Sequence, residues 1–261
     1  MNEQTKMVLA KVPAATLVFW IVKIAATTLG ETGGDAVSMS MNLGYLVGTA
    51  IFAVIFFAFV SFQVSAKRFH PVLYWLTIIA TTTVGTTLAD FADRSLGIGY
   101  AGGSSILALL LVLSLAVWYK SLGSISIETI HTPKAEIFYW VTIMFSQTLG
   151  TALGDWTADT QGFGYVGGAI LFGTLLTGLA VLYFTKNVQP ALLFWAAFIL
   201  TRPLGAVVGD FLDKPADAGG LALSRYTASA SLMAFIALCM WIFPQKAAVE
   251  RQQVRNPGES L

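Results

Sequence analysis

Long apolar runs alternate with short polar stretches along most of the chain. The clearest runs lie at 43–62, 106–118, 169–184 and 231–243. They are too long and too frequent for a soluble core, because a membrane-spanning helix needs about 20 mainly apolar residues. The pattern predicts eight membrane spans, at 12–34, 43–63, 71–93, 101–120, 135–157, 166–185, 190–212 and 222–243.

One motif recurs four times within these spans. It is an aromatic residue and a Trp, then a Gly ten residues after the Trp and an Asp fifteen residues after it. An internal repeat of this kind defines the architecture. The copies are Phe19-Trp20 with Gly30 and Asp35, Tyr74-Trp75 with Gly85 and Asp90, Tyr139-Trp140 with Gly150 and Asp155, and Phe194-Trp195 with Gly205 and Asp210.

Each copy is long enough for two spans, so the motif predicts four helical hairpins within a single membrane domain, 1–261. The hairpins are expected at 12–63, 71–120, 135–185 and 190–243, followed by a cytoplasmic tail at 244–261. Pro13, Pro71, Pro133 and Pro190 precede the odd-numbered spans and mark helix starts, because proline is tolerated in the first helical turn.

The composition supports an all-α integral membrane protein. The chain is 56% hydrophobic and 11% charged, whereas soluble domains contain about 25% charged residues. The net charge of +1 gives no reason to expect a nucleic-acid partner. The single Cys239 excludes an intramolecular disulfide. No catalytic motif or cofactor fingerprint is present, so the chain is not expected to be an enzyme.

The distribution of charge predicts the orientation of the repeats. Ten of the fifteen Lys and Arg residues lie at the termini or between hairpins, so the positive-inside rule places both termini in the cytoplasm. All four repeats then point the same way, as parallel repeats. These basic residues are Lys6, Lys11, Lys67, Arg68, Lys120, Lys134, Lys186, Lys246, Arg251 and Arg255.

Helical phase predicts which face of the odd-numbered helices points inward. Positions 7, 11 and 18 after each Trp fall within roughly 20° of it, and the Asp about 60° away. A polar stripe in a membrane helix faces the bundle interior. We therefore expect an inner ring of odd helices and an outer ring of even ones. Position 7 holds Thr27, Thr82, Gln147 and Arg202, and position 11 holds Glu31, Thr86, Thr151 and Ala206.

The acids of this stripe form a candidate cation site near the outer ends of the odd helices. Carboxylate and hydroxyl oxygens suit hard cations such as Mg²⁺ and Mn²⁺. The alternative is that these acids only end or cap the helices. The expected ligands are Asp35, Asp90, Asp155, Asp210, Glu31, Asp93 and Asp213, and Thr27, Thr82, Gln147, Thr86 and Thr151 would line a polar path.

Two cations lie well inside the spans. Lys23 and Arg202 either form structural salt bridges with the acids or act as counter-charges that exchange with a transported cation. Pro203 follows Arg202 and is expected to break its helix, as in many transporters. The aromatic positions have two interpretations, a lipid-interface belt and a cytoplasmic gate, and the belt suits the residue before each Trp better. The gate would consist of Trp20, Trp75, Trp140 and Trp195.

The fourfold motif, with two spans and a Trp in each copy, resembles a family of bacterial membrane proteins. That family is built from four tandem two-helix repeats of unknown function, often described as uncharacterised membrane-anchored proteins. The resemblance covers about residues 13 to 243 and implies a multi-pass protein of the bacterial inner membrane. The fourth copy departs from the others, because it lacks the Gly-Tyr pair and carries Arg202-Pro203.

These features together predict a secondary transporter that exchanges a small cation, such as a divalent metal, for protons. A passive ion channel and a non-transporting membrane sensor or scaffold are the alternatives. The expected partners are the lipid bilayer and the cation itself. Four repeats can close a ring within one chain, and a homodimer is left open.

Overall fold

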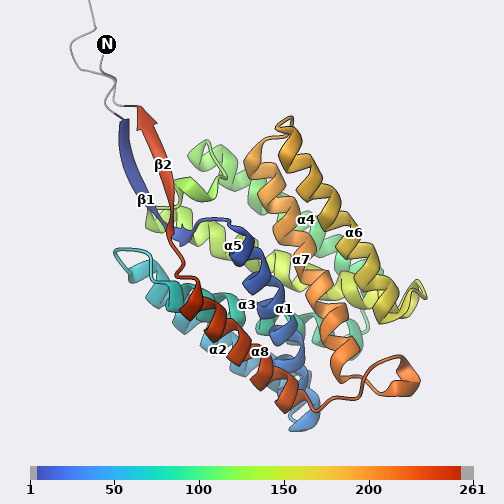
Figure 1. The fold of residues 1–261 in the computed structure, drawn as a ribbon. Coiled ribbons are helices and arrows are strands. Elements are labelled where there is room, and N and C mark those ends of the chain that lie inside the picture. Colours follow the sequence, from blue (N-terminus) through green and yellow to red (C-terminus); the bar gives the residue numbers. More distant parts are fainter. Residues whose placement is uncertain (1–4, 254–261) are drawn as a thin grey trace, which may run out of the picture.

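The computed structural model describes the backbone of residues 5–253 and the side chains of residues 7–250. Part of the predicted tail, residues 254–261, and the side chains of the predicted cytoplasmic residues Lys6 and Arg251 lie outside these ranges. The described residues form eight α-helices and two short strands (Figure 1). The helices are α1 (Leu17–Asp35), α2 (Gly44–Ser65), α3 (Pro71–Asp90), α4 (Tyr100–Leu122), α5 (Pro133–Asp155), α6 (Gly164–Thr185), α7 (Pro190–Asp213) and α8 (Arg225–Ile242).

The fold is helical, as predicted, with the addition of one two-stranded sheet. Strand β1 (Thr5–Pro13) pairs antiparallel with β2 (Ala247–Gln253), and the register is interrupted between Leu9 and Pro13. The sheet stands at one end of the helical bundle (Figure 1). Residues 247–253 therefore belong to a strand, although the sequence assigned them to a simple tail.

Because β1 occupies residues up to Pro13, the first helix begins later than predicted. The sequence placed that start at residue 12, with Pro13 as its marker, but Pro13 is the last residue of β1. Helix α1 begins at Leu17, where the Thr16 hydroxyl accepts a hydrogen bond from the Phe19 amide at 3.2 Å. A capping hydroxyl satisfies an amide that has no partner inside the helix. The other three prolines do begin α3, α5 and α7.

Three odd-numbered helices continue into a π-helical turn directly after the motif Asp. These turns are η1 (Ala36–Ser40), η2 (Phe91–Ser95) and η4 (Trp156–Thr160). Wide turns of this type are rare and occur frequently at functional sites. Helix α7 has no such turn and ends at Asp213, before the short 3₁₀ turn η5 (Ala216–Ala218). The fourth repeat is thus the exception among the described elements.

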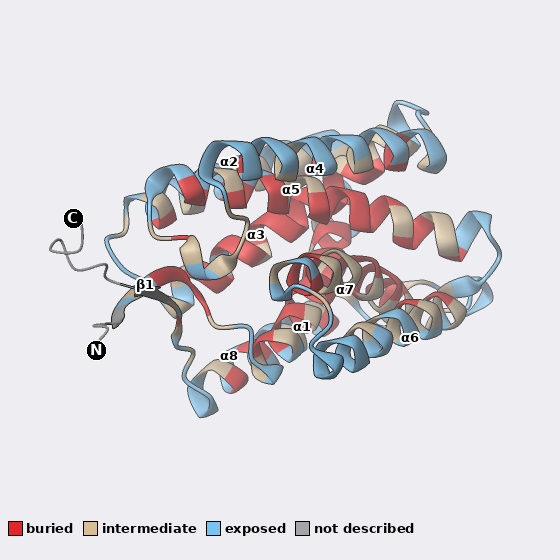
Figure 2. Ribbon diagram, turned by 90° about the horizontal axis from the view of Figure 1, so that it is seen from above, coloured by how far each residue is buried: buried red, intermediate tan, exposed pale blue. Residues whose placement is uncertain are grey.

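The helices contact one another in a regular order. Helix α1 packs against α3 and α7, and α5 also packs against α3 and α7. Each even-numbered helix packs on the odd-numbered helix of the next repeat: α2 on α3, α4 on α5, α6 on α7 and α8 on α1. Figure 2 shows that the buried residues gather on the odd helices, whereas the even helices are largely exposed. The exposed side chains of α2, α4 and α6 are mainly apolar.

Six of the eight described helices are long and apolar enough to cross a membrane. They are α2, α3, α4, α6, α7 and α8. Helices α1 and α5 are less apolar, because α1 carries Lys23, Glu31 and Asp35 and α5 carries Lys134, Glu136 and Asp155. The eight predicted helices are therefore present, and six of them have the length and apolar composition of a membrane span.

Helix α7 is not broken at Pro203. The α-helix runs from Pro190 to Asp213 with the proline inside it. The expected interruption at mid-depth is thus wrong. Pro203 lacks an amide proton, and its ring packs close to Gly150 of α5, where an added Cβ would lie 3.0 Å from Pro203 Cδ.

Candidate functional site

The motif acids lie at the ends of the odd helices and are buried. Asp35, Asp90 and Asp155 each occupy the last α-helical position before a π turn, and Asp210 lies one turn before the end of α7. Their exposed fractions are 1–3%. Four carboxylates so far from solvent are costly unless they are paired with cations or protonated.

Six acids form three overlapping groups, in each of which the carboxylate oxygens lie within 4.8 Å of one another. We call these six residues the acid cluster. Glu31 belongs to two of these groups and so lies beside the motif Asp of all four repeats. Asp35 connects the third group to the other two. The groups are Glu31 with Asp155 and Asp210, Glu31 with Asp35 and Asp90, and Asp35 with Asp210 and Asp213.

Asp93 is separate from these groups. It lies in the π turn η2 and is partly exposed. Its Oδ1 atom points at α4, where a Cβ added to Gly103 would lie 2.6 Å from it. Of the seven acids expected from helical phase, the structure therefore brings six together and leaves Asp93 outside.

Three cationic side chains surround the acid cluster at the ends of the helices. Lys214 pairs with Asp35 and lies 3.1 Å from Asp210. Arg94 Nε lies 2.8 Å from Asp90 Oδ1, and its Nη2 lies 3.3 Å from Asp155 Oδ2. Arg225 completes the set, with its Nε 3.0 Å from Asp213 and 3.8 Å from Asp35.

These three cations were not among the site residues predicted from the sequence. Arg94 and Lys214 follow Asp90 and Asp210 by four residues, a spacing that places an acid and a base on the same helical face. That spacing could have predicted the pairing of Arg94 with Asp90 and of Lys214 with Asp210. Burial opposes the charged form of Lys214, but Asp210 and Asp35 outweigh it and raise the Lys214 pKa well above its ordinary value.

A fourth cation lies deeper, on the inner faces of the odd helices. Arg202 is fully buried, and its Nη2 donates to Glu31 Oε2 at 2.9 Å. The same nitrogen donates to the Thr86 hydroxyl at 2.6 Å and to the Thr151 hydroxyl at 2.5 Å. These three partners occupy position 11 in the first three repeats. The fourth repeat has the small Ala206 there, which packs closely against Gly154 of α5.

The charges within this site do not balance. When all ten groups are counted in their ionised forms, six buried carboxylates face four cationic side chains, which leaves two formal negative charges. One divalent cation or two protons would neutralise them. The arrangement therefore has the charge and the oxygen ligands that a hard cation requires.

The motif Gly explains how the odd helices approach so closely. A Cβ added to Gly30 would lie 2.7 Å from Thr82 Oγ1, and one added to Gly85 would lie 3.1 Å from Gln147 Cβ. A Cβ on Gly150 would overlap Arg202, and one on Gly205 would overlap Thr27. Each Gly thus faces the position-7 residue of the next repeat, and the fourth Gly faces the first repeat.

At the other end of the bundle, the Phe or Tyr of each motif contacts the Trp of the next repeat, in the same cyclic order as the Gly contacts. Phe19 lies 5.4 Å from Trp75, Tyr74 5.7 Å from Trp140, and Tyr139 6.0 Å from Trp195, between ring centroids. Phe194 lies 5.6 Å from Trp20 and joins the last repeat to the first. We call these eight rings the aromatic cluster.

The aromatic cluster is mostly shielded from the surroundings of the protein. The Phe or Tyr before each Trp is at most 8% exposed, so the expectation that these residues suit a lipid belt is wrong. The reason is that they point toward one another across the bundle, as the Tyr74 and Tyr139 hydroxyl groups do at 2.5 Å. Trp75, Trp140 and Trp195 are buried and Trp20 is partly buried.

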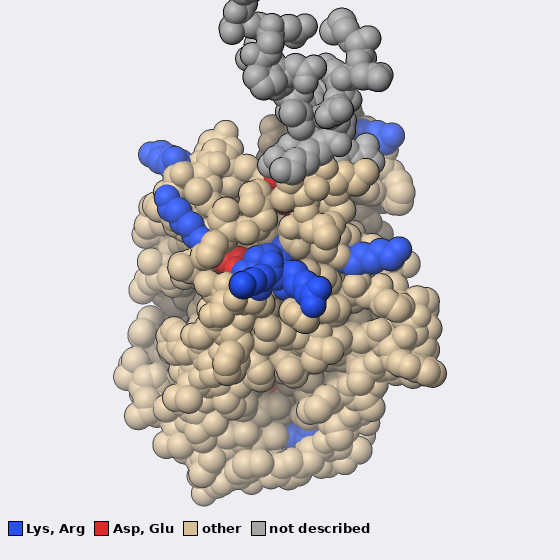
Figure 3. All heavy atoms as spheres, turned by 90° about the vertical axis from the view of Figure 1, so that its left-hand side faces the viewer, with Lys and Arg blue, Asp and Glu red and all other residues tan. Residues whose placement is uncertain are grey.

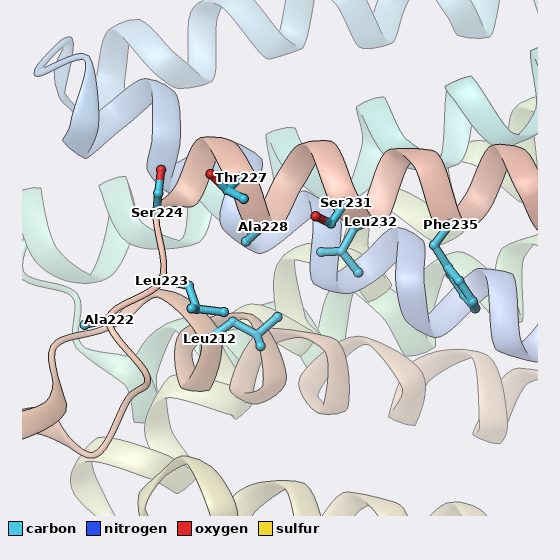
Figure 4. Close-up of a pocket in the computed structure, with 9 residues that line it drawn as sticks. All are labelled: Leu212, Ala222, Leu223, Ser224, Thr227, Ala228, Ser231, Leu232 and Phe235. Carbon is cyan, nitrogen blue, oxygen red and sulfur yellow. The ribbon is translucent and has the colours of Figure 1, made fainter.

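The polar residues between the two clusters are enclosed as well. Each expected member of the polar path is fully buried, at 0% exposure: Thr27, Thr82, Gln147, Thr86 and Thr151. By contrast, an open groove of about 620 Å³ lies on the outside of the bundle, between α8 and the end of α7 (Figure 4). Leu212, Leu223 and Phe235 line it, and no member of the acid cluster does.

Comparison with protein families finds four consecutive matches to the Repeat of Unknown Function (DUF347), at residues 18–69, 73–123, 138–188 and 193–247. The chain belongs to this family. Each DUF347 copy contains one odd-numbered helix and the even-numbered helix after it, so the predicted fourfold repeat is confirmed. Comparisons with curated proteins and with solved structures gave no match.

Proposed function

We propose that this DUF347 protein is a secondary transporter that exchanges a small, oxygen-preferring divalent cation for protons. The cation would bind at the acid cluster, with Glu31, Asp35, Asp155 and Asp210 as central ligands. The proposal rests on six buried carboxylates whose four cationic neighbours leave two negative charges.

The first part of the proposal is that all eight helices cross the membrane, with odd helices inside and even helices outside. Two observations support it. The even helices expose apolar side chains and have few buried residues. The odd helices bury Thr, Gln, Asp and Glu, which lipid cannot satisfy. Helices α1 and α5 are more polar because they contribute charged side chains to this interior. The equivalent helices of the other two repeats, α3 and α7, have the composition of membrane spans, which supports the same placement for α1 and α5.

The second part is the orientation, in a bacterial inner membrane with both termini in the cytoplasm. Lys67, Arg68, Lys120 and Lys134 lie at or near the links between repeats, on the side of the aromatic cluster. Figure 3 shows Lys and Arg side chains gathered in the upper half of one face, above a broad and mostly uncharged surface. Such a distribution agrees with the positive-inside rule.

The choice of a hard divalent cation follows from the ligands. The acid cluster offers carboxylate oxygens, and Thr86 and Thr151 offer hydroxyl oxygens beside Glu31. The described residues near the cluster contribute no His or Cys, so a softer metal finds none of its preferred ligands there. Exchange of one divalent cation for two protons would leave the net charge of the buried site unchanged.

A carrier fits better than an open channel, because the interior is closed at two levels. Arg202 bridges Glu31, Thr86 and Thr151 at mid-depth. The aromatic cluster fills the end of the bundle beyond it. Passage of an ion therefore needs a rearrangement, as in alternating access.

Cation flux into and out of reconstituted vesicles tests this function directly. We expect Mn²⁺ or Mg²⁺ to move with countermovement of protons at carrier rates, and Asp155→Asn and Asp210→Asn to abolish the flux. Asp217→Asn is the matched control, because Asp217 is an exposed acid at the same end of the protein. Normal flux in both cluster variants would contradict the site. Flux at channel rates without proton movement would identify a channel, and binding without flux a sensor.

A further inference from the structure

A second buried charge lies away from the acid cluster. Lys23 of α1 is fully buried, and its Nζ lies 3.5 Å from the Thr201 hydroxyl and 4.1 Å from the centroid of the Phe198 ring. Among the residues that the structure describes, it forms no ion pair. The equivalent position in the other repeats is Ile78, Ile143 and Phe198. A buried ammonium group without an anion is strongly unfavourable.

Several side chains at position 7 of the repeats, near Lys23, have polar atoms without partners. We call the four residues at this position, Thr27, Thr82, Gln147 and Arg202, the position-7 layer. Arg202 uses Nη2 for Glu31 and the two threonines, but its Nε and Nη1 make no hydrogen bond within the described structure. Both polar atoms of the Gln147 side chain, and the Thr82 hydroxyl, are also unpaired. All three residues occupy position 7 of their repeats and are fully buried. Buried polar atoms without partners indicate a missing water or ion.

Lys23 and this layer adjoin one another through α7. The Thr27 hydroxyl, in the position-7 layer, lies 3.1 Å from the Lys23 carbonyl oxygen and 3.2 Å from the Thr201 carbonyl oxygen. Thr201 directly precedes Arg202. Of the two cations, only Arg202 has an acid partner in the described structure, Glu31. Lys23 and the layer therefore combine a buried lysine without an anionic partner and unused hydrogen-bond donors.

We propose that this layer binds a small inorganic anion of the size of chloride. Lys23 would supply the charge, and the free Nε and Nη1 of Arg202, the Gln147 amide and the Thr82 hydroxyl would donate hydrogen bonds. Water alone would satisfy the donors, whereas an anion would also compensate the charge of Lys23 in its protonated form. Because Lys23 has no counterpart in the other repeats, the protein has one such site per chain.

This anion site is separate from the proposed cation site. The Arg202–Glu31 pair stands between the two, and the anion ligands Lys23 and Gln147 take no part in the acid cluster. Binding of an anion does not require that the protein transports a cation. Failure of one proposal would leave the other intact.

Thermal unfolding of the purified protein in detergent tests the anion site. The sodium salts of chloride, bromide and gluconate are compared at equal ionic strength, with a chelator present to remove divalent cations. We expect chloride and bromide to raise the unfolding temperature in a saturable manner and the larger gluconate to have no such effect, because a ligand that binds the folded state stabilises it.

Four variants assign the effect to the layer. Lys23→Met should abolish the chloride-dependent shift, and Lys23→Arg should retain it. Gln147→Leu should weaken the apparent affinity about tenfold or more, as expected for the loss of a hydrogen bond to a charged group. Lys120→Met removes an exposed lysine and should behave as the wild type.

Two results would overturn the proposal. One is an equal unfolding temperature of the wild type in chloride, bromide and gluconate. The other is an equal chloride response in wild type and Lys23→Met, which would indicate a general salt effect. If Lys23→Met does not fold, an undiminished response in both Gln147→Leu and the Thr82→Val variant would overturn it instead.

Discussion

A Cβ atom on Gly205 of α7 would lie 2.6 Å from the Cβ of Thr27 in α1, so the last repeat packs against the first. Gly30 makes the same approach to Thr82 of the next repeat. The motif Gly is thus a packing residue, and its four copies hold the odd-numbered helices at a distance that no larger residue allows.

The first prediction concerns this close approach. Gly205→Ala and Gly150→Ala should each lower the free energy of unfolding by about 1–3 kcal/mol, because the added methyl group overlaps the neighbouring side chain. Thermal or denaturant unfolding in detergent measures the change. Gly178→Ala is the control: Gly178 lies inside α6 with open space around its Cα, so alanine should be neutral or stabilise the helix by up to about 1 kcal/mol.

Equal effects at Gly178 and Gly205 would contradict this account. They would show that the substitutions act through helix propensity alone and that the interior relaxes around the new methyl group.

The second prediction concerns the buried pair of Arg202 and Glu31. Arg202→Met should destabilise the protein by about 3–5 kcal/mol, because it leaves the Glu31 carboxylate buried without its cation. Adding Glu31→Gln should recover part of this loss, because the double variant no longer buries an unpaired charge. A double-mutant cycle of unfolding free energies measures the coupling. Strictly additive effects would show that the two residues do not depend on each other.

The structure shows why some of these contacts could be predicted from the sequence. The spacing of Trp, Gly and Asp set the helical phase, and the residues at positions 7 and 11 are indeed buried. The repeat itself provides this information, because the same phase recurs on four helices. Helical phase also placed Asp93 inward, but the wider π turn after Asp90 changes the rotation there.

Contacts between segments that are distant in the sequence could not be predicted from the periodicity of apolar and polar residues. Strands β1 and β2 are separated by the whole helical bundle in sequence, and neither has a pattern that identifies its partner. The pairing of Lys214 with Asp35 and of Arg225 with Asp213 depends on the course of the link between α7 and α8, which periodicity does not predict.

The third prediction concerns the attachment of the sheet to the bundle. Lys11 of β1 pairs with Glu136 of α5, and its Nζ also donates to the Val64 carbonyl oxygen at 3.0 Å. Glu136→Ala should therefore release β1, since it leaves a buried lysine unpaired. Hydrogen exchange should accelerate in residues 5–13 and 247–253 at least tenfold, while α3 and α5 remain protected. Glu128→Ala, at an exposed acid in the same link region, is the control.

Unchanged exchange in both strands of the Glu136→Ala variant would indicate that the pair does not hold the sheet. The remaining contacts of β1, such as the hydrogen bond from the Lys11 amide to the Ile130 carbonyl oxygen at 2.7 Å, would then be sufficient.

The fourth prediction concerns the hydroxyl pair within the aromatic cluster. Tyr74 and Tyr139 are both fully buried, and their hydroxyl oxygens lie 2.5 Å apart. Tyr74→Phe should lower the unfolding free energy by about 1–3 kcal/mol, because the Tyr139 hydroxyl loses its partner in a dry environment. Tyr74→Phe combined with Tyr139→Phe should be close to the wild type, because Phe19 and Phe194 already occupy this position in the other two repeats.

Unfolding of both single variants and of the double variant measures the coupling between the two hydroxyl groups. A double variant that is less stable than either single one would contradict the expectation, and it would mean that each hydroxyl stabilises the cluster through other contacts. If the pair also keeps this end of the bundle closed during the proposed transport, the double variant should fold normally and transport at an altered rate. That result would separate the stability of the aromatic cluster from its proposed role as a gate.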